Sequence, residues 1–477
     1  MLNSSFKIIV KSYGKNHRHP WKNGDPSSAT GSGFAIEITV KSAKRKFVMT
    51  NAHVAKGEDS FIQIMKPNSD RLYNAKVFNC APELDMALLE IDNKDSKEFW
   101  DSVTIFPLGR VPKKGSAVHV VGFPLGGDNP SVTRGVVSRI NIVNYSGAIK
   151  NIALQIDAAV NHGNSGGPVF DETGKRIIGI AFSGRAEGNM INFIIPTFLI
   201  RHYLDRISKT GNFEGVCDLM IKSQPIQNRT MQQELLGNER GLLITDVAPT
   251  GSAGMILETH DVLLSIDKVS VTNDGTIIVN DQYEPCANIT DMYEKVPFWH
   301  YLRMKHPGDQ VELTFLRNGE KHTKKCTLQV EDPLVQRMDF RISDEYCIIG
   351  GLVFLPLNYW HIYPSPNDAN TSSSYFIWKR NLLPYLFDKF KEFDDQQIVI
   401  LSEVVPGPIT AGYDLMNYRL HSANGEEVRN IKHLQKISDK AKGIVRFEFD
   451  YNNIALVNIT DAKRDQKEIL SRLGIAS

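Results

Sequence analysis

The sequence predicts a mainly β protein, in which an all-β N-terminal domain is followed by two smaller α+β modules. From Phe6 to about Leu204, short runs rich in valine, isoleucine and phenylalanine are separated by glycine, proline and asparagine. Such runs are typical of a β-sandwich or a pair of β-barrels. The two segments that follow combine strand and helix patterns. Residues 398–406 echo residues 242–249, which indicates two copies of one module.

The elements can be assigned in order along the 477 residues, a length that requires several cores. The first segment is expected to contain strands at 47–50, 117–121 and 177–182 and a helix at 197–207. The second is expected to contain strands at 241–247, 262–266 and 311–316 and helices at 231–236 and 297–305. The third is expected to contain strands at 351–357, 397–404 and 445–449 and a helix at 431–438. The predicted domains are therefore residues 1–207, 208–335 and 336–477.

Two further stretches lie in the third segment. Residues 364–374 are polar and predict a flexible loop. Apolar residues then recur at helical spacing and predict an amphipathic helix that packs on its own domain: Leu382, Leu383, Leu386, Phe387 and Phe390.

Composition excludes several classes of protein. There are 55 basic and 54 acidic residues, so no broad positive field favours nucleic acid or anionic membrane. No apolar run of about 18 residues predicts a membrane span, and the first residues lack the apolar run of a secretory signal. Five widely spaced cysteines without a C-x-x-C pattern fit reduced thiols. We expect an intracellular protein, or one exported without a signal peptide, and a periplasmic one if a leader was removed.

A serine between glycines, in residues 163–167, is the most specific feature of the chain. Glycines let the backbone turn sharply, so that the hydroxyl of Ser165 points outward and nearby N–H groups converge. Gly163, Asn164 and Ser165 are therefore candidate donors of an oxyanion hole. Alone, this pattern also suits an ordinary turn.

Two motifs upstream give this serine a chemical role. His53 follows an apolar strand, and Asp85 enters another one. A serine hydroxyl needs a neighbouring base near neutral pH, and imidazole titrates in the useful range. A carboxylate can hold the imidazole tautomer and stabilise its protonated form. Taken singly, His53 suits a core position and Asp85 a turn, but their order before Ser165 predicts a chymotrypsin-like double β-barrel serine protease.

The chain resembles the HtrA/DegP-like serine proteases, and the plant-type Deg branch in particular, over nearly its whole length. The stretches that carry the resemblance are 30–34, 50–54, 84–89, 122–129, 131–138, 155–169, 346–354 and 420–434. It implies that His53 is the general base, that Asp85 orients it and that Ser165 forms the acyl-enzyme. Family members usually have proline at the position of His162, whose peptide bond to Gly163 sets the oxyanion hole. Histidine leaves φ free, so the hole is either easier to collapse or unaffected by an exposed substitution.

The resemblance also suggests a specificity pocket and peptide-binding sites. Ala159, six residues before the nucleophile, would line the base of the pocket without charge, and Ile180, Ala181 and Phe182 would form a wall and the edge strand. In the first PDZ-like module, Arg240, Gly241, Leu242 and Leu243 are the expected carboxylate-binding loop, and the strand that follows would accept a peptide. In the second module, a role in scaffolding is as well supported as peptide capture.

These features predict an ATP-independent endopeptidase that degrades unfolded or misfolded proteins and is regulated by PDZ domains. No metal site and no cofactor is expected. Peptide C-termini or internal segments are the expected PDZ ligands, and the resemblance implies a trimer-based homo-oligomer with Tyr13 and Trp21 as candidate contacts. Two alternatives stay open: a protease with one dedicated target, such as a secreted effector, and a catalytically silent peptide-binding scaffold or chaperone.

Overall fold

A computed structural model describes most of the chain. The described residues are 1–56, 60–125, 127–145, 149–182, 191–285, 294–337, 342–363 and 373–475, without the side chains of 373–379. Cys286 and most of the predicted loop at 364–374 lie outside them. The chain divides into two compact units. The first comprises Met1–Tyr13, Pro26–Val247 and Gly251–Glu331, and the second comprises Gly14–Asp25, Ala248–Thr250 and Asp332–Ser477.

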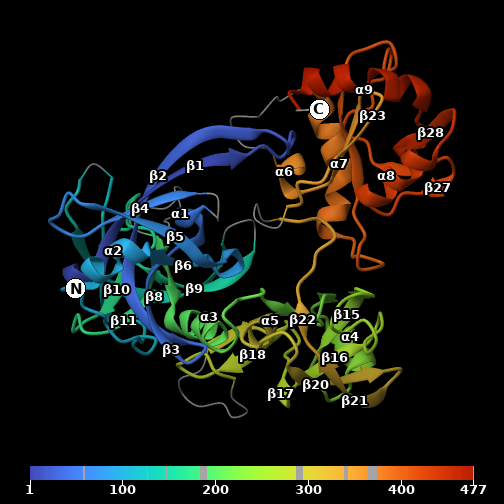
Figure 1. Cartoon of the computed structure of the whole chain (residues 1–477). Helices are drawn as coiled ribbons and strands as arrows, with labels where there is room; N and C mark the ends of the chain where they lie inside the picture. Colours follow the sequence, from blue (N-terminus) through green and yellow to red (C-terminus); the bar gives the residue numbers. More distant parts are fainter. Residues whose placement is uncertain are drawn as a thin grey trace. The chain divides into compact units, whose positions relative to one another are not determined.

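Six strands close the first β-barrel of unit 1 in the order β1-β2-β3-β6-β5-β4 (Figure 1). They are β1 (Ser5–Lys15), β2 (Asn23–Val40), β3 (Ala43–Thr50), β4 (Phe61–Met65), β5 (Leu72–Ala81) and β6 (Met86–Ile91). Side chains alternate between the two faces of a strand. On β1, Phe6, Ile8 and Val10 are fully buried, while Lys7 reaches the surface and pairs with Asp128.

Six further strands close the second barrel, in the order β10-β11-β12-β9-β8-β7. Its strands are β7 (Ala117–Gly122), β8 (Ser131–Asn144), β9 (Lys150–Ile156), β10 (Pro168–Asp171), β11 (Ile177–Phe182) and β12 (Asn192–Pro196). Residues 152–154 and Ile156 on β9 are almost completely buried. This barrel carries the glycine-flanked Ser165, whereas the first barrel carries His53 and Asp85.

Helices connect and close the barrels. They are α1 (Ala52–Ala55), α2 (Asn93–Trp100) and α3 (Thr197–Thr210). The predicted helix at 197–207 is present and runs on to Thr210, where Gly211 ends it in the left-handed conformation, with φ 85°. The sequence did not indicate α2, because Phe99 is the one residue that this helix buries.

The rest of unit 1 is an α+β module built on a sheet in the order β14-β15-β16-β20-β21, with β17 paired to β16. Its strands are β14 (Ile221–Gln224), β15 (Leu242–Val247), β16 (Val262–Ile266), β17 (Val269–Ser270), β20 (Gln310–Arg317) and β21 (Glu320–Thr327). Two small pairs are β13 (Cys217–Asp218) with β22 (Gln329–Val330) and β18 (Thr276–Val279) with β19 (Glu294–Pro297). Its helices are α4 (Arg229–Leu235) and α5 (Trp299–Arg303).

Unit 2 holds the second α+β module, with one sheet in the order β23-β24-β25 and another in the order β27-β26-β28-β29. The strands are β23 (Cys347–Ile349), β24 (Leu352–Pro356), β25 (Val399–Val404), β26 (Leu420–Ala423), β27 (Glu426–Glu427), β28 (Ile444–Phe449) and β29 (Ile454–Asn458). The helices are α6 (Tyr359–Ile362), α7 (Ser373–Phe387), α8 (Ile431–Lys440) and α9 (Ile459–Leu473). The predicted amphipathic helix corresponds to the end of α7, and its Leu382 and Leu386 are buried in this module. Phe390 lies outside the helix, which ends at Phe387.

Residues 14–25, between β1 and β2, belong to unit 2. There Trp21 donates a hydrogen bond from Nε1 to the carbonyl of Leu473 at 3.0 Å, and His19 Nε2 lies 2.8 Å from a carboxylate oxygen of Glu403. Trp21 therefore has contacts within its own chain, whereas Tyr13 is 64% exposed. Assembly into trimers through these two residues stays a prediction.

The architecture confirms the predicted fold class, a mainly β protein with a trypsin-like double barrel and α+β PDZ modules. None of the helices in the described residues is long and apolar enough to cross a membrane.

Candidate active site

Asp85 is fixed at the first barrel by an unusual backbone conformation. It follows a short 3-10 turn (Pro82–Leu84) and has φ 51°, in the left-handed region that aspartate tolerates better than most residues. Its side chain is fully buried, and Asn51 Nδ2 donates to its carbonyl oxygen at 2.9 Å. The carboxylate is therefore held rigidly, away from solvent.

His53 contacts this carboxylate with its backbone nitrogen and with a ring nitrogen. Its backbone N–H donates to Asp85 Oδ1 at 3.0 Å, and its Nδ1 lies 2.8 Å from Oδ2. Because Nδ1 is engaged, Nε2 is directed away from Asp85, and the side chain is 37% exposed. Burial lowers the pKa of His53, but the charge and hydrogen bond of Asp85 outweigh it and raise the pKa above its ordinary value near 6.5.

The serine turn depends on two glycines in the left-handed region, Gly163 with φ 96° and Gly166 with φ 86°. The backbone N–H groups of this turn differ in their partners. That of Gly166 donates to the carbonyl of Ala181 at 2.9 Å, whereas the N–H groups of Gly163 and Ser165 donate to no described residue. Asn164 N–H donates to the carbonyl of Asn161 at 2.9 Å. The expectation that Asn164 belongs to the oxyanion hole is therefore wrong, because its donor is already used.

The two barrels bring the serine turn against Ser32, Thr50 and Asn51, close to His53 in the sequence. The carbonyl of Ser165 accepts a hydrogen bond from Ser32 N at 2.8 Å. A Cβ atom on Gly166 would lie 2.2 Å from Thr50 Oγ1 and 3.1 Å from the nitrogen of Asn51, two residues before His53. Ser165 is partly exposed, and its hydroxyl makes no hydrogen bond with the described residues. Its oxygen is therefore available for a substrate.

The peptide bond between His162 and Gly163 has a defined orientation. The carbonyl of His162 accepts a hydrogen bond from Leu125 N at 2.9 Å. In a trans peptide the carbonyl and the N–H point in opposite directions, so the N–H of Gly163 points away from Leu125. A positive φ at the third residue of the turn 161–164 is the mark of a type II turn. The side chain of His162 is exposed, and the hydrogen bond with Leu125 joins two backbone groups.

The residues predicted to form the specificity pocket differ in exposure. Ala159 is exposed, and its carbonyl accepts a hydrogen bond from Thr133 Oγ1 at 2.8 Å. Phe182 is 9% exposed, and its ring lies 6.4 Å from that of His53. Ile180 and Ala181 have no exposed surface and hydrogen-bonded neighbours on both sides, so the expected free edge does not include them.

Sequence reasoning missed Asn192 near this site. Its side chain is 8% exposed and donates to the carbonyl of Ala158 at 2.8 Å, next to Ala159. Residues 183–190, which follow Phe182, lie outside the described part of the chain. A single asparagine at the start of a strand gives no signal of this contact.

The expected peptide site in the first PDZ module needs a correction. Strand β15, which follows Arg240 and Gly241 and contains Leu242 and Leu243, pairs with β14 on one side and with β16 on the other. A peptide has no edge to join there. Strand β14 pairs with β15 alone among the described strands, so its other edge is open.

The loop before β14 carries an unexpected carboxylate. Met220 has φ 58°, and its N–H donates to Asp218 Oδ1 at 2.7 Å. Burial and the charge of Glu331 raise the pKa of Asp218 to about 6, against the opposing effects of Arg303 and the N–H groups of Met220 and Leu219. Asp218 thus uses the donors of its own loop.

The second PDZ module has no open edge at the equivalent strand. Gly350 and Gly351, with φ 59° and 93°, turn the chain so that β23 pairs with β24. Strand β25 covers the other side of β24. Cys347 on β23 donates from Sγ to Gln435 Oε1 of α8 at 3.1 Å. The chain itself therefore fills the space beside β24, which favours scaffolding over peptide capture in this module.

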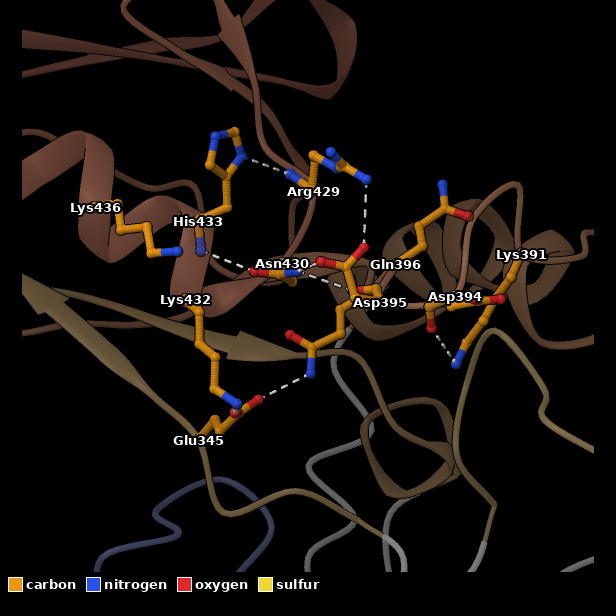
Figure 2. A pocket seen from close by; sticks show the side chains of 11 residues that line it. Glu345, Lys391, Asp394, Asp395, Gln396, Arg429, Asn430, Lys432, His433 and Lys436 are labelled. Carbon is orange, nitrogen blue, oxygen red and sulfur yellow. Dashed lines mark hydrogen bonds and ion pairs between the residues drawn. The ribbon is translucent and has the colours of Figure 1, made fainter. Parts of the chain in front are cut away.

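A polar pocket of about 550 Å³ also lies in unit 2, between α8 and the segment before β25 (Figure 2). Its cations face carboxylates: Lys432 lies 3.0 Å from Glu345, and Arg429 lies 3.4 Å from Asp395. None of the residues predicted as functional lines it. Lys391 pairs with Asp332 as well, so most of the basic side chains at this pocket are matched within the chain.

Comparison with known proteins agrees with this geometry. Residues 31–180 match the family model of the trypsin-like peptidase domain, and residues 335–477 match that of a PDZ domain. Protease Do-like 2, chloroplastic, of Arabidopsis thaliana is 32% identical over 485 residues, which cover 100% of this chain and 74% of that protein. Protease Do-like 4, mitochondrial, of the same plant is 31% identical over 100% of this chain and 84% of its own length.

Among solved structures, that of the HtrA-type protease AlgW with a decapeptide matches with a TM-score of 0.50 and 22% identity. The match covers 70% of this chain and 97% of AlgW. Fold, family models and relatives together define a trypsin-like serine protease with PDZ domains. The chain belongs to the HtrA/Deg family of serine proteases.

Proposed function

We propose that Ser165 is the nucleophile of an endopeptidase, with His53 as its general base and Asp85 as the residue that orients His53. The observation that carries this proposal is the buried Asp85 carboxylate, which engages Nδ1 of His53 at 2.8 Å. This contact keeps the proton of neutral imidazole on Nδ1, so that the lone pair of Nε2 is available.

The reaction proceeds in two acyl transfers. Ser165 Oγ attacks the scissile carbonyl carbon while its proton passes to His53 Nε2, and the resulting imidazolium is stabilised by Asp85. His53 then protonates the leaving amine, which leaves an ester on Ser165. Water attacks this ester with His53 again as base, and the carboxylic acid product leaves with Ser165 regenerated.

The N–H groups of Gly163 and Ser165 are the proposed oxyanion donors. Both are free of partners among the described residues, and the His162 carbonyl is held by Leu125 on the opposite side of the peptide. Donors fixed in advance stabilise the negative charge that develops on the substrate oxygen. Ala159 adds no charge at the proposed pocket, so a small or medium apolar side chain is the expected preference.

Unfolded or misfolded polypeptides are the proposed substrates, and no ATP is required. The Do-like relatives, whose names describe them as proteases, support this proposal. Incubation of the protein with casein in the absence of ATP is expected to yield fragments, and a fluorophosphonate probe is expected to label it. Ser165→Ala should abolish both.

The two alternatives give different results in this experiment. Equal absence of labelling in the protein and in Ser165→Ala would contradict the protease mechanism and favour a silent scaffold. Labelling of Ser165 without cleavage of casein would contradict the broad substrate range and favour a dedicated target.

Peptides are proposed to bind along the open edge of β14 in the first PDZ module. A peptide antiparallel to β14 has its carboxyl end beside Leu219 and Met220, whose N–H groups are engaged by Asp218. We therefore expect internal segments to bind as well as free C-termini.

Fluorescence anisotropy with the inactive Ser165→Ala protein at pH 7.5 tests this. A peptide and its C-terminal amide are expected to bind within twofold of each other. Asp218→Ala should create a preference for the free acid, whereas Asp274→Ala should not, although Asp274 accepts a comparable bond from Thr276 N at 3.2 Å. A strong preference for the free acid with Asp218 present would contradict the proposal.

A further inference from the structure

Ser32 occupies a junction beside the proposed active site. It lies on β2 and is fully buried. Its hydroxyl donates to the carbonyl of Gly163 at 2.6 Å and accepts a hydrogen bond from Phe123 N at 2.8 Å. Its backbone N–H donates to the carbonyl of Ser165. One side chain of the first barrel thus joins the serine turn to the loop after β7.

The turn around Gly163 needs such an anchor. A type I and a type II turn differ mainly by a flip of the central peptide, which here would replace the N–H of Gly163 with the carbonyl of His162. Glycine allows either sign of φ, so Gly163 itself does not fix the choice between the two turns. The hydrogen bonds from Leu125 N to His162 and from Ser32 Oγ to Gly163 hold the two successive carbonyls of this turn.

Three glycines pack closely against Ser32. A Cβ atom on Gly122 would lie 3.0 Å from Ser32 Oγ, and one on Gly167 would lie 3.2 Å from Ser32 Cβ. A Cβ atom on Gly166 would lie 2.2 Å from the carbonyl oxygen of Ser32. Loss of the hydroxyl would leave the carbonyl of Gly163 and the N–H of Phe123 buried without this partner, a cost that a rearrangement of the backbone around Gly163 can relieve.

We propose that Ser32 is a positioning residue for the reaction: its hydroxyl holds the Gly163 turn in the form whose N–H groups bind the oxyanion. The inference rests on the proposed function of Ser165. Ser32 touches no substrate and acts through the turn. Its effect therefore falls on the transition state, in which the substrate oxygen carries charge, more than on substrate binding.

The test compares Ser32→Ala with a matched serine in the first PDZ module. Ser252 Oγ donates to the carbonyl of Asp218 at 2.6 Å and accepts from Gln329 N at 2.9 Å, the same pair of bonds away from the serine turn. Ser32→Ala is expected to lower kcat about 10- to 100-fold with KM within about twofold, since it weakens the oxyanion site without removing a donor. Ser252→Ala is expected to leave both constants within about twofold.

A peptide aldehyde gives a readout that a merely structural role would not change. Its covalent adduct places an oxygen in the oxyanion site, so its affinity for Ser32→Ala should fall in parallel with kcat, while the affinity for a product peptide stays constant. His162→Pro should partly restore kcat in the Ser32→Ala background, because proline followed by glycine is a typical pair at the two central positions of a type II turn. The N–H that proline removes donates to no described residue.

The outcomes separate this inference from the proposed function. If the wild-type protein is labelled at Ser165 and folded Ser32→Ala keeps kcat within about twofold, the positioning role is refuted and the nucleophile stands. Absence of rescue by His162→Pro also contradicts the inference. If Ser32→Ala does not fold, Ser32→Thr, which keeps the hydroxyl, must retain aldehyde affinity in proportion to its kcat. A protein that fluorophosphonate does not label refutes the proposed function itself.

Discussion

Asp85→Asn is expected to lower kcat about 10⁴-fold and to leave the fold intact. Asp85 accepts hydrogen bonds from both the backbone N–H and Nδ1 of His53. Asparagine has one acceptor oxygen, and its amide would donate to Nδ1. That contact favours the tautomer with the proton on Nε2, which cannot take the proton of Ser165. Steady-state kinetics with a peptide substrate measure the effect.

The pH profile of kcat/KM for the same variant tests whether Asp85 acts through His53. His53 must be neutral to act as base, so kcat/KM rises with pH through its pKa. Because Asp85 raises this pKa, the rise of kcat/KM on the acidic side of the profile, its acidic limb, is expected above pH 6.5 in the wild-type protein. In Asp85→Asn the charge is lost and burial, which lowers the pKa, remains, so the residual limb should move to lower pH.

A matched aspartate controls for lost stability. Asp261 is 2% exposed and pairs with Arg317 in the first PDZ module, away from His53. Asp261→Asn should lower the melting temperature without moving the acidic limb of kcat/KM. An Asp85→Asn protein with kcat within about tenfold of wild type and an unchanged limb would contradict the assigned role, because the tautomer effect alone predicts a far larger loss.

The fold was predictable where burial follows local periodicity. The strand at 47–50 and the helix at 197–207 carry their signal in their own apolar spacing, and both are present. Helix α2 was not predictable in this way, because it buries Phe99 alone. The peptide edge was assigned to residues 242–247 rather than to β14, because strand order is a property of the whole sheet and not of one strand.

In the proposed site, too, some residues could be predicted from local sequence and others could not. His53, Asp85 and Ser165 were found because each lies in a short motif of characteristic composition. The contacts that orient the turn could not be found from composition: Ser32 and Gly163 are 131 residues apart, and the hydrogen bond between Leu125 and His162 joins two backbone groups. A departure from the usual proline at His162 signalled that the turn needs support, but not which residues provide it.

Gly163→Ala is expected to lower kcat about 10²- to 10³-fold, the loss caused by removal of one oxyanion donor. At φ 96°, a Cβ atom on Gly163 would lie 2.3 Å from the carbonyl oxygen of Phe123 and 3.0 Å from Leu125 N. Both are backbone atoms that cannot rotate away. The alanine therefore forces φ to a negative value, which turns the N–H away and brings the carbonyl of His162 toward the site of the developing negative charge.

Gly308 separates this effect from backbone strain. Its φ is 92°, and a Cβ atom there would have no neighbour within 4 Å. Gly308→Ala thus carries a similar left-handed strain, about 1 to 3 kcal/mol, without a collision and away from Ser165. Both variants should lose stability in thermal unfolding, but Gly163→Ala alone should lose kcat and affinity for a peptide aldehyde. Equal kinetics in the two variants would mean that the N–H of Gly163 does not bind the oxyanion, since only its orientation distinguishes them.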